Sequence, residues 1–112
     1  MRVAVVGSRT LTDICAGPYL PAGTTEIISG GARGADAAAR AWAEAHGLPL
    51  REILPDYRRW GRYAPIRRND EIVAAADYVV ALWDGVSRGT AYVIRRCLRE
   101  GKALRLVVLT RG

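Results

Sequence analysis

The sequence of 112 residues predicts a single α/β domain, residues 1–112, built on five parallel strands. Two observations predict this class. Short apolar segments alternate along the chain with segments of helical periodicity, and a loop of small residues follows three of the apolar segments. The first segment, residues 2–6, is apolar almost without interruption, which is typical of a strand buried on both faces of a parallel sheet.

The other strands are expected at residues 25–29, 49–54, 77–82 and 104–109. The segment 49–54 is short and partly polar, so we expect it at or near a sheet edge. The strand order that we expect is 3-2-1-4-5, with helices on both faces of the sheet, which makes a three-layer sandwich. In this order the direction of winding reverses between strands 1 and 4, and a crevice forms there at the carboxyl ends of the strands.

Three helices are expected between the strands. The first begins at Ala35 and the second at Pro65, while the third covers Thr90–Glu100 and ends at Gly101. Residues 13–16 allow a further short helix. The residues expected to face inward are Ala35, Ala38, Ala39, Trp42 and Ala45 in the first helix, and Thr90, Ile94, Cys97 and Leu98 in the third.

The composition favours an anionic partner. The formal net charge is +6, and Lys102 is the only lysine among the 17 lysine and arginine residues. Arginine suits bidentate recognition of phosphate, so the charge fits a nucleotide or a nucleic acid.

Other classes of function are excluded or not expected. His46 is the only histidine, which excludes a histidine-based metal site and a Ser-His-Asp triad, and we expect no metal and no required cofactor. Cys15 and Cys97 are expected to be reduced packing residues. No apolar run approaches the ~20 residues that span a membrane, and a strand begins at once, so we expect a cytoplasmic protein without membrane contact.

Loops of small residues follow strands 1, 2 and 4 at residues 7–10, 30–36 and 84–90. Because the carboxyl ends of parallel strands meet at one edge of the sheet, the three loops should converge at the crevice. Glycines there let backbone amides approach a ligand, and the positive end of a following helix dipole attracts an anion. We therefore expect a ligand that carries phosphate. The alternative for residues 30–36 is a tight turn without a ligand.

The segment 55–63 shows no clean period and interleaves arginines with aromatic residues, so we expect a loop. Tyr57 or Trp60 could stack on a base from there. The alternative is a solvated connection whose aromatic side chains cover the edge of the core.

The loops resemble those of a known superfamily. The matching pieces are Val6–Arg9, Ser29–Asp36, Arg68-Asn69 and Gly89-Thr90. They resemble the SLOG superfamily, which groups the DNA-processing protein DprA with the "lonely guy" phosphoribohydrolases, and are most similar to its YspA/YpsA-related branch. This resemblance implies a Rossmann-like fold that binds nucleotides or nucleotide derivatives, and a homodimer.

The resemblance also implies a set of site residues. Arg9 and Arg33 would pair with phosphate, and Arg68 matches an arginine that the phosphoribohydrolases use at the scissile ribose. Other roles remain open, since Ser8 and Asp36 could cap a helix, and Arg33 could be solvated. The complete candidate set is Gly7, Ser8, Arg9, Gly30, Gly31, Arg33, Gly34, Asp36, Arg68, Asn69, Ser87, Gly89 and Thr90.

The sequence departs from the phosphoribohydrolases at one important position. Their motif Pro-Gly-Gly-x-Gly-Thr-x-x-Glu ends in a glutamate, and Val93 stands at that place here. Cleavage of an N-glycosidic bond develops positive charge on the ribose, which a carboxylate stabilises and a valine does not. We therefore expect binding or sensing of a nucleotide. The first alternative is phosphoribohydrolase-like hydrolysis with Arg68 and either Asp84 or Asp36, and the second is DprA-like binding of single-stranded nucleic acid.

Overall fold

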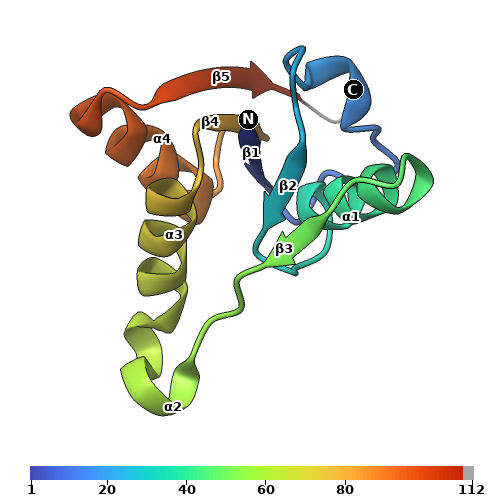
Figure 1. Ribbon diagram of the computed structural model, residues 1–112. Coiled ribbons are helices and arrows are strands. Elements are labelled where there is room, and N and C mark those ends of the chain that lie inside the picture. The colour runs from blue at the N-terminus through green and yellow to red at the C-terminus, as the bar shows by residue number, and fades with distance from the viewer. Residues whose placement is uncertain (110–112) are drawn as a thin grey trace.

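The computed structural model describes residues 1–109 as an α/β fold with one five-stranded parallel sheet (Figure 1). The strand order is β3-β2-β1-β4-β5, which confirms the predicted order 3-2-1-4-5. The short strand β3 lies at an edge, as its polar residues predict. The strands are β1 (Arg2–Gly7), β2 (Glu26–Ser29), β3 (Leu50–Glu52), β4 (Tyr78–Trp83) and β5 (Ala103–Val108).

The central strand β1 sets the position of the crevice. It pairs with β2 on one side and with β4 on the other, and Val3, Ala4 and Val5 are fully buried. Because the strand order reverses between β1 and β4, the loops after these two strands diverge to opposite faces of the sheet and leave a crevice between them.

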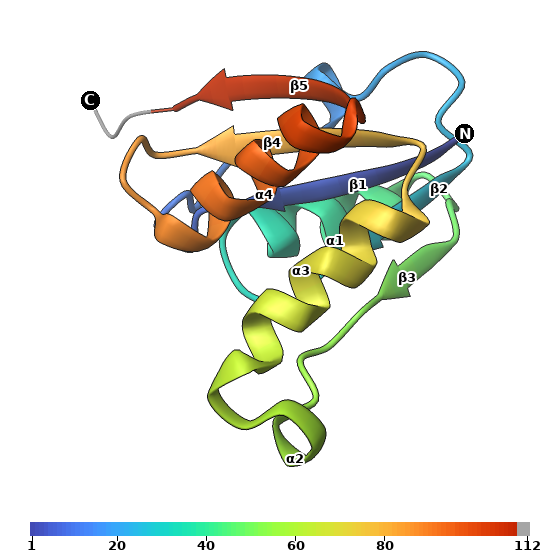
Figure 2. The same cartoon turned by 90° about the vertical axis from the view of Figure 1, so that its left-hand side faces the viewer.

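Helices cover both faces of the sheet, so the predicted three-layer Rossmann-like sandwich is confirmed. α1 (Ala35–Ala45) covers one face, and α3 (Ala64–Ala75) and α4 (Arg88–Glu100) cover the other (Figure 2). Each face has its own core of buried side chains, one with Val5, Ile27 and Leu82, the other with Val79 and Ile72. None of the helices within residues 1–109 is long and apolar enough to cross a membrane.

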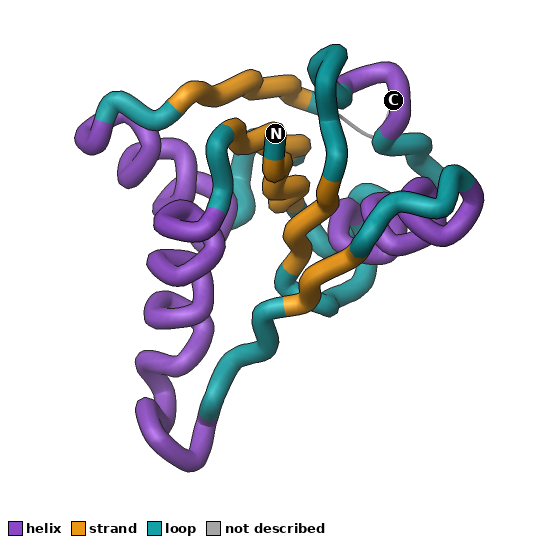
Figure 3. Tube along the Cα trace, viewed as in Figure 1, coloured by secondary structure: helices purple, strands orange, loops and turns teal. Residues whose placement is uncertain are grey.

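Two predictions of local structure, for residues 13–16 and for residues 55–63, were wrong. Residues 13–16 form no helix, because Asp13 has φ 57° and the helical hydrogen bonds begin only at the short 3-10 helix η1 (Gly17–Tyr19). The segment 55–63 is not a loop but a helical arm, made of α2 (Tyr57–Trp60) and the 3-10 helix η2 (Gly61–Tyr63). Asp56 caps α2 by accepting a hydrogen bond from the backbone N–H of Arg59 at 3.1 Å. Figure 3 shows this arm as a helical tip away from the strands.

The inward faces of two helices also differ from the prediction. Leu98 is 69% exposed, because α4 presents Thr90, Val93, Ile94 and Cys97 to the sheet and no strand lies beyond β5 to cover Leu98. In α1 the buried residues are Ala35, Asp36, Ala39 and Ala43, whereas Ala45 is exposed. The buried face of α1 thus includes Asp36, which the apolar periodicity alone did not indicate.

Gly34 makes a close contact that a side chain would prevent, so we predict that Gly34→Ala destabilises the fold by about 2–4 kcal/mol. Its φ is 73°, and a Cβ there would meet the carbonyl oxygen of Ser8 and lie 2.7 Å from the Cα of Arg9. Gly23 is the control, since its φ is 85° and no atom lies within 4 Å of a Cβ placed there. Gly23→Ala should cost about 1 kcal/mol from backbone strain alone. Urea denaturation measures both, and equal losses would contradict the role of the contact.

Candidate functional site

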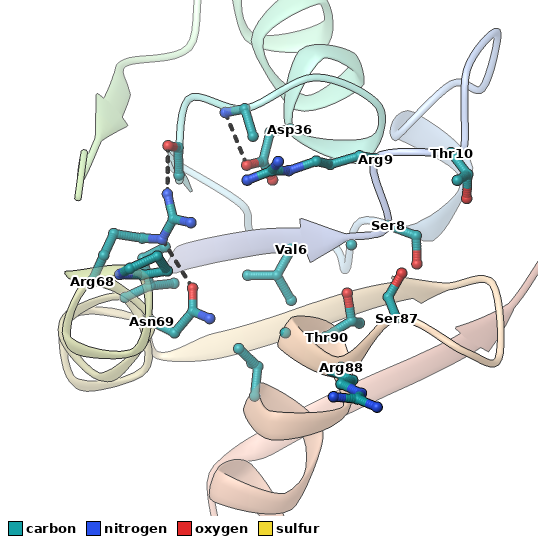
Figure 4. A pocket seen from close by; sticks show the side chains of 17 residues that line it. Val6, Ser8, Arg9, Thr10, Asp36, Arg68, Asn69, Ser87, Arg88 and Thr90 are labelled. Carbon is teal, nitrogen blue, oxygen red and sulfur yellow. Dashed lines mark hydrogen bonds between the residues drawn. The ribbon is translucent and has the colours of Figure 1, made fainter. Parts of the chain in front are cut away.

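A cavity of about 310 Å³ lies at the crevice between β1 and β4 (Figure 4). Its walls come from the loops after β1, β2 and β4, from one side of α3 and from the first two turns of α4. The convergence of the three loops, which the strand order predicts, is thus present in the structure. The cavity is lined by Val6, Gly7, Ser8, Arg9, Thr10, Gly30, Ala32, Asp36, Pro65, Arg68, Asn69, Ile72, Ser87, Arg88, Gly89, Thr90 and Val93.

Ser8 joins the loops after β1 and β4. Its side chain is buried, and its Oγ accepts a hydrogen bond from the backbone N–H of Asp84 at 3.0 Å. Its own N–H donates to the carbonyl oxygen of Leu82 at 3.0 Å, and its carbonyl oxygen accepts from the N–H of Ala35 at 3.4 Å. Ser8 therefore fixes the wall of the cavity through its backbone and its hydroxyl, and its side chain caps no helix.

Arg68 reaches from α3 across the cavity towards the loop after β2. Its Nη1 donates to the carbonyl oxygen of Gly30 at 2.8 Å, and its Nε donates to the Oδ1 of Asn69 at 2.9 Å. These two bonds leave further guanidinium N–H groups for other acceptors. Partial burial lowers the pKa of Arg68, although Asp36 nearby acts in the opposite direction. An oriented, partly desolvated guanidinium is suited to bind an anion.

Asp36 is the only carboxylate that lines the cavity within the described residues. It is 7% exposed, and its Oδ2 accepts a hydrogen bond from the N–H of Ala32 at 3.1 Å. Burial raises the pKa of Asp36, even though the Ala32 N–H, Arg68 and Arg9 favour the ionised form. Figure 4 shows the side chain of Arg9 extending from the β1 loop towards Asp36. A carboxylate that is costly to bury and lies in a cleft is typical of functional sites.

The first turn of α4 forms the wall opposite Arg68. The helix begins after Ser87, and no side chain caps its first N–H groups. These uncapped amides and the helix dipole attract negative charge. Gly89 keeps the approach open, because a Cβ placed there would have only the Nδ2 of Asn69, at 4.0 Å, within contact range.

Asp84, a catalytic candidate from the sequence, accepts four hydrogen bonds in the structure. Its Oδ1 accepts from the N–H groups of Val86 and Ser87 at 2.9 and 2.8 Å. Its Oδ2 accepts from the hydroxyls of Thr10 and Ser87 at 2.9 and 3.1 Å. These bonds hold the pKa of Asp84 well below its usual range. Asp84 does not line the cavity and instead organises the loop before α4.

The structure brings most of the predicted site residues to the cavity. The exceptions are Gly31, Arg33 and Gly34, of which Arg33 is exposed and Gly34 is buried against the β1 loop. Sequence reasoning missed Arg88, which lies within the loop 84–90 and begins α4. It also missed Ile72, whose only signal in the sequence is that it is an apolar residue within the helix expected to begin at Pro65.

The chain carries a pattern known from other proteins. Residues 20–60 match the YspA, cpYpsA-related SLOG family. The resemblance to the SLOG family is confirmed. The matched segment contains the glycine turn after β2 and α2 of the arm, but not η2 or the loops after β1 and β4. Comparison with curated proteins and with solved structures gave no match. The SLOG pattern indicates a role related to nucleotides without naming one.

Removal of the Asp84 charge should destabilise the fold, although Asp84 itself does not line the cavity. We predict that Asp84→Asn lowers the free energy of unfolding by about 1–3 kcal/mol at neutral pH, since hydrogen bonds to a charged acceptor are lost. The lowered pKa means that this contribution is present above the unfolded carboxyl pKa of about 3.9 and is lost as the pH falls towards the folded-state pKa. Thermal melts from neutral to strongly acid pH measure it. Asp13→Asn, at an exposed carboxylate, is the control, and an equal effect there would contradict the prediction.

Proposed function

We propose that this protein binds or senses a nucleotide or nucleotide derivative in the cavity between β1 and β4. The observation that carries the proposal is the pairing of an uncapped helix N-terminus, at α4, with the oriented guanidinium of Arg68 across one cavity of about 310 Å³. This volume lies at the lower end of the range for small-molecule sites. Three arginines and one carboxylate line it, which favours an anionic ligand.

The lining offers a different partner to each part of a nucleotide. A phosphate fits the first turn of α4, where Ser87, Gly89 and Thr90 line the cavity and backbone N–H groups can donate to phosphate oxygens. A ribose fits beside Asp36, because a carboxylate accepts hydrogen bonds from sugar hydroxyls. The apolar side chains of Ile72 and Val93 give the remaining wall a surface for a ring.

The cavity favours binding over hydrolysis. Val93 lines it at the position where the phosphoribohydrolases carry their glutamate. Asp36 is then the carboxylate that a hydrolase-like reaction would have to use, since Asp84 is held by the loop. Because burial raises the pKa of Asp36, stabilising positive charge on a ribose would require the arginines beside it to keep it ionised. Hydrolysis of an N-glycosidic bond is therefore the alternative activity of this same site.

Titration calorimetry with AMP, ADP-ribose and NAD tests the proposal. We expect at least one of the three to bind, and Arg68→Ala to weaken its affinity about tenfold or more, because a charge-assisted hydrogen bond is lost. The matched control is Arg67→Ala. Arg67 is the neighbouring arginine on α3, and it is exposed and lies over the Trp60 ring instead of lining the cavity. Equal weakening by both variants would show that net charge, not the cavity, determines binding.

Gly89→Val provides a second check, because it adds bulk at the first turn of α4 where the structure has space. Binding should be lost while the unfolding midpoint stays close to that of the unchanged protein. Absence of binding by all three nucleotides at millimolar concentration would overturn the proposal. Release of free base during the titration, followed by chromatography, would instead favour hydrolysis, and Asp36→Asn should then abolish it.

One observation favours a second candidate, the binding of single-stranded nucleic acid along the arm. The guanidinium of Arg59 lies 4.8 Å and that of Arg67 4.3 Å from the centre of the Trp60 ring. Tyr57 and Tyr63 are more than half exposed. Aromatic rings interleaved with arginines can stack on bases and neutralise phosphates. The arm leads directly into α3, whose Pro65, Arg68 and Asn69 line the cavity.

The second candidate predicts steep salt dependence. A short single-stranded oligonucleotide should bind at low salt, and its affinity should fall sharply as salt rises, because counterions are released from its phosphates. Arg67→Ala should reduce both the affinity and the salt slope, whereas it should leave nucleotide binding unchanged. Fluorescence anisotropy measures both quantities. A flat salt response, or an unchanged slope in the variant, would reject the arm as a nucleic-acid site.

A further inference from the structure

Gly30 lies in the wall of the cavity between two charged side chains. Unlike the following Gly31, it does not have a positive φ, so its φ does not require glycine. The space around it does, because a Cβ placed on Gly30 would lie 2.6 Å from the Nη1 of Arg68 and 3.0 Å from the Oδ2 of Asp36. We call the space between these two atoms, beside the Cα of Gly30, the Gly30 gap.

The two side chains reach the gap from helices on opposite faces of the sheet and do not bond to each other. Within residues 1–109 no ion pair joins Arg68 to Asp36. The carbonyl oxygen of Gly30 holds Arg68, and the N–H of Ala32 holds Asp36, as the dashed lines in Figure 4 show. The loop after β2 thus keeps a guanidinium donor and a carboxylate acceptor on two sides of one small space.

Burial makes this separation costly. Asp36 is 7% exposed, and among the described residues its carboxylate accepts only the hydrogen bond from Ala32. Arg68 is partly buried, which lowers its pKa. Charges that are buried in proteins normally have charged or hydrogen-bonding partners. The carboxylate and the guanidinium therefore lack a group that would bond to both of them across the gap.

The gap selects a group of particular chemistry. The distances of Nη1 and Oδ2 from the Cβ position are in the range of hydrogen bonds, so a single oxygen in the gap can reach both atoms. That oxygen must accept from Arg68 and donate to Asp36, and a hydroxyl does both. A phosphate oxygen only accepts, an amino group only donates, and a base carries its donors and acceptors on separate atoms. Among the parts of a nucleotide, the sugar hydroxyls satisfy both sides of the gap.

We propose that the Gly30 gap holds a hydroxyl of the ribose, so that the cavity selects ribonucleotides by the hydroxyls of their sugar. This inference rests on the proposed function and adds the feature of the ligand that Arg68 and Asp36 recognise together. The first turn of α4, where a phosphate fits, forms the wall opposite Arg68. In a nucleotide the carbon that carries the phosphate and the two hydroxyls project from opposite faces of the sugar ring, which matches this arrangement.

Titration calorimetry with AMP and with dideoxy-AMP, which lacks both sugar hydroxyls, tests the inference. We expect dideoxy-AMP to bind at least about tenfold more weakly, because hydrogen bonds to two charged groups are lost. The two forms of AMP that lack one hydroxyl each then identify the hydroxyl in the gap. Equal affinities for AMP and dideoxy-AMP would overturn this inference and leave the proposed function in place.

Two variants test the gap itself. Asp36→Asn removes the charged acceptor, and Gly30→Ala fills the space. The atoms nearest to the new Cβ are the ends of side chains, so Gly30→Ala should stay folded, which a thermal melt checks. Each variant should bind AMP and dideoxy-AMP with nearly equal affinity, and Asp36→Asn is sufficient if Gly30→Ala unfolds. The control is Arg88→Ala in the first turn of α4, which should weaken both ligands by the same factor.

Three further results would contradict the inference. The first is a preference for AMP that persists in either gap variant when that variant is folded, and the second is a preference that Arg88→Ala removes. The third is absence of AMP binding to the unchanged protein at millimolar concentration. In that last case, binding of ADP-ribose or NAD would still support the proposed function, whereas absence of binding by all three would overturn both proposals.

Discussion

The hydrogen bond from the Asp84 N–H to the buried Ser8 hydroxyl connects the two loops at the switch point of the sheet. Those loops belong to neighbouring strands whose following segments leave to opposite faces. A second bond, from the Thr10 hydroxyl to the Oδ2 of Asp84 at 2.9 Å, also joins them. Ser8 also accepts a bond from the first turn of α1, which approaches closely enough only because residue 34 is glycine. One buried serine thus places α1 and the loop before α4 around the same cavity.

The electrostatics of the cavity depend on this arrangement. Arg68 and Asp36 come from different helices on opposite faces of the sheet, and both reach the loop after β2, at Gly30 and Ala32. Burial lowers the pKa of the arginine and raises that of the aspartate, so the protein bears the cost of holding both charges at the crevice. A ligand with phosphate and hydroxyl groups would supply partners to both, which is the physical reason for the function that we propose.

The sequence predicted the sheet and the three helices that cover it, but not the local structure of residues 13–16 and 57–63. Continuous apolar segments and helical periodicity are local signals, and they were sufficient for the five strands and their order. The predictions of a short helix at Asp13 and of an inward-facing Leu98 were wrong, because the environment of both residues depends on distant elements. Residues 13–16 form no helix, since Asp13 has a positive φ of 57°. Leu98 is exposed because the sheet ends at β5. The arm was missed because Gly61 suggested a loop, although Asp56 is an ordinary N-cap residue.

The sequence by itself determined that glycine loops follow three strands. It also determined that the carboxyl ends of these strands lie at one edge of the sheet, because the rules for connecting parallel strands leave few possible strand orders. It also placed Val93 where the resemblance to the phosphoribohydrolases would put their glutamate. Only the tertiary structure decided what each polar side chain does. Asp84 and Asp36 are both aspartates near glycine loops, yet four nearby donors hold Asp84 in its loop, while Asp36 is buried against the cavity. That difference arises from contacts between residues far apart in sequence, such as Thr10 with Asp84, which no local pattern records.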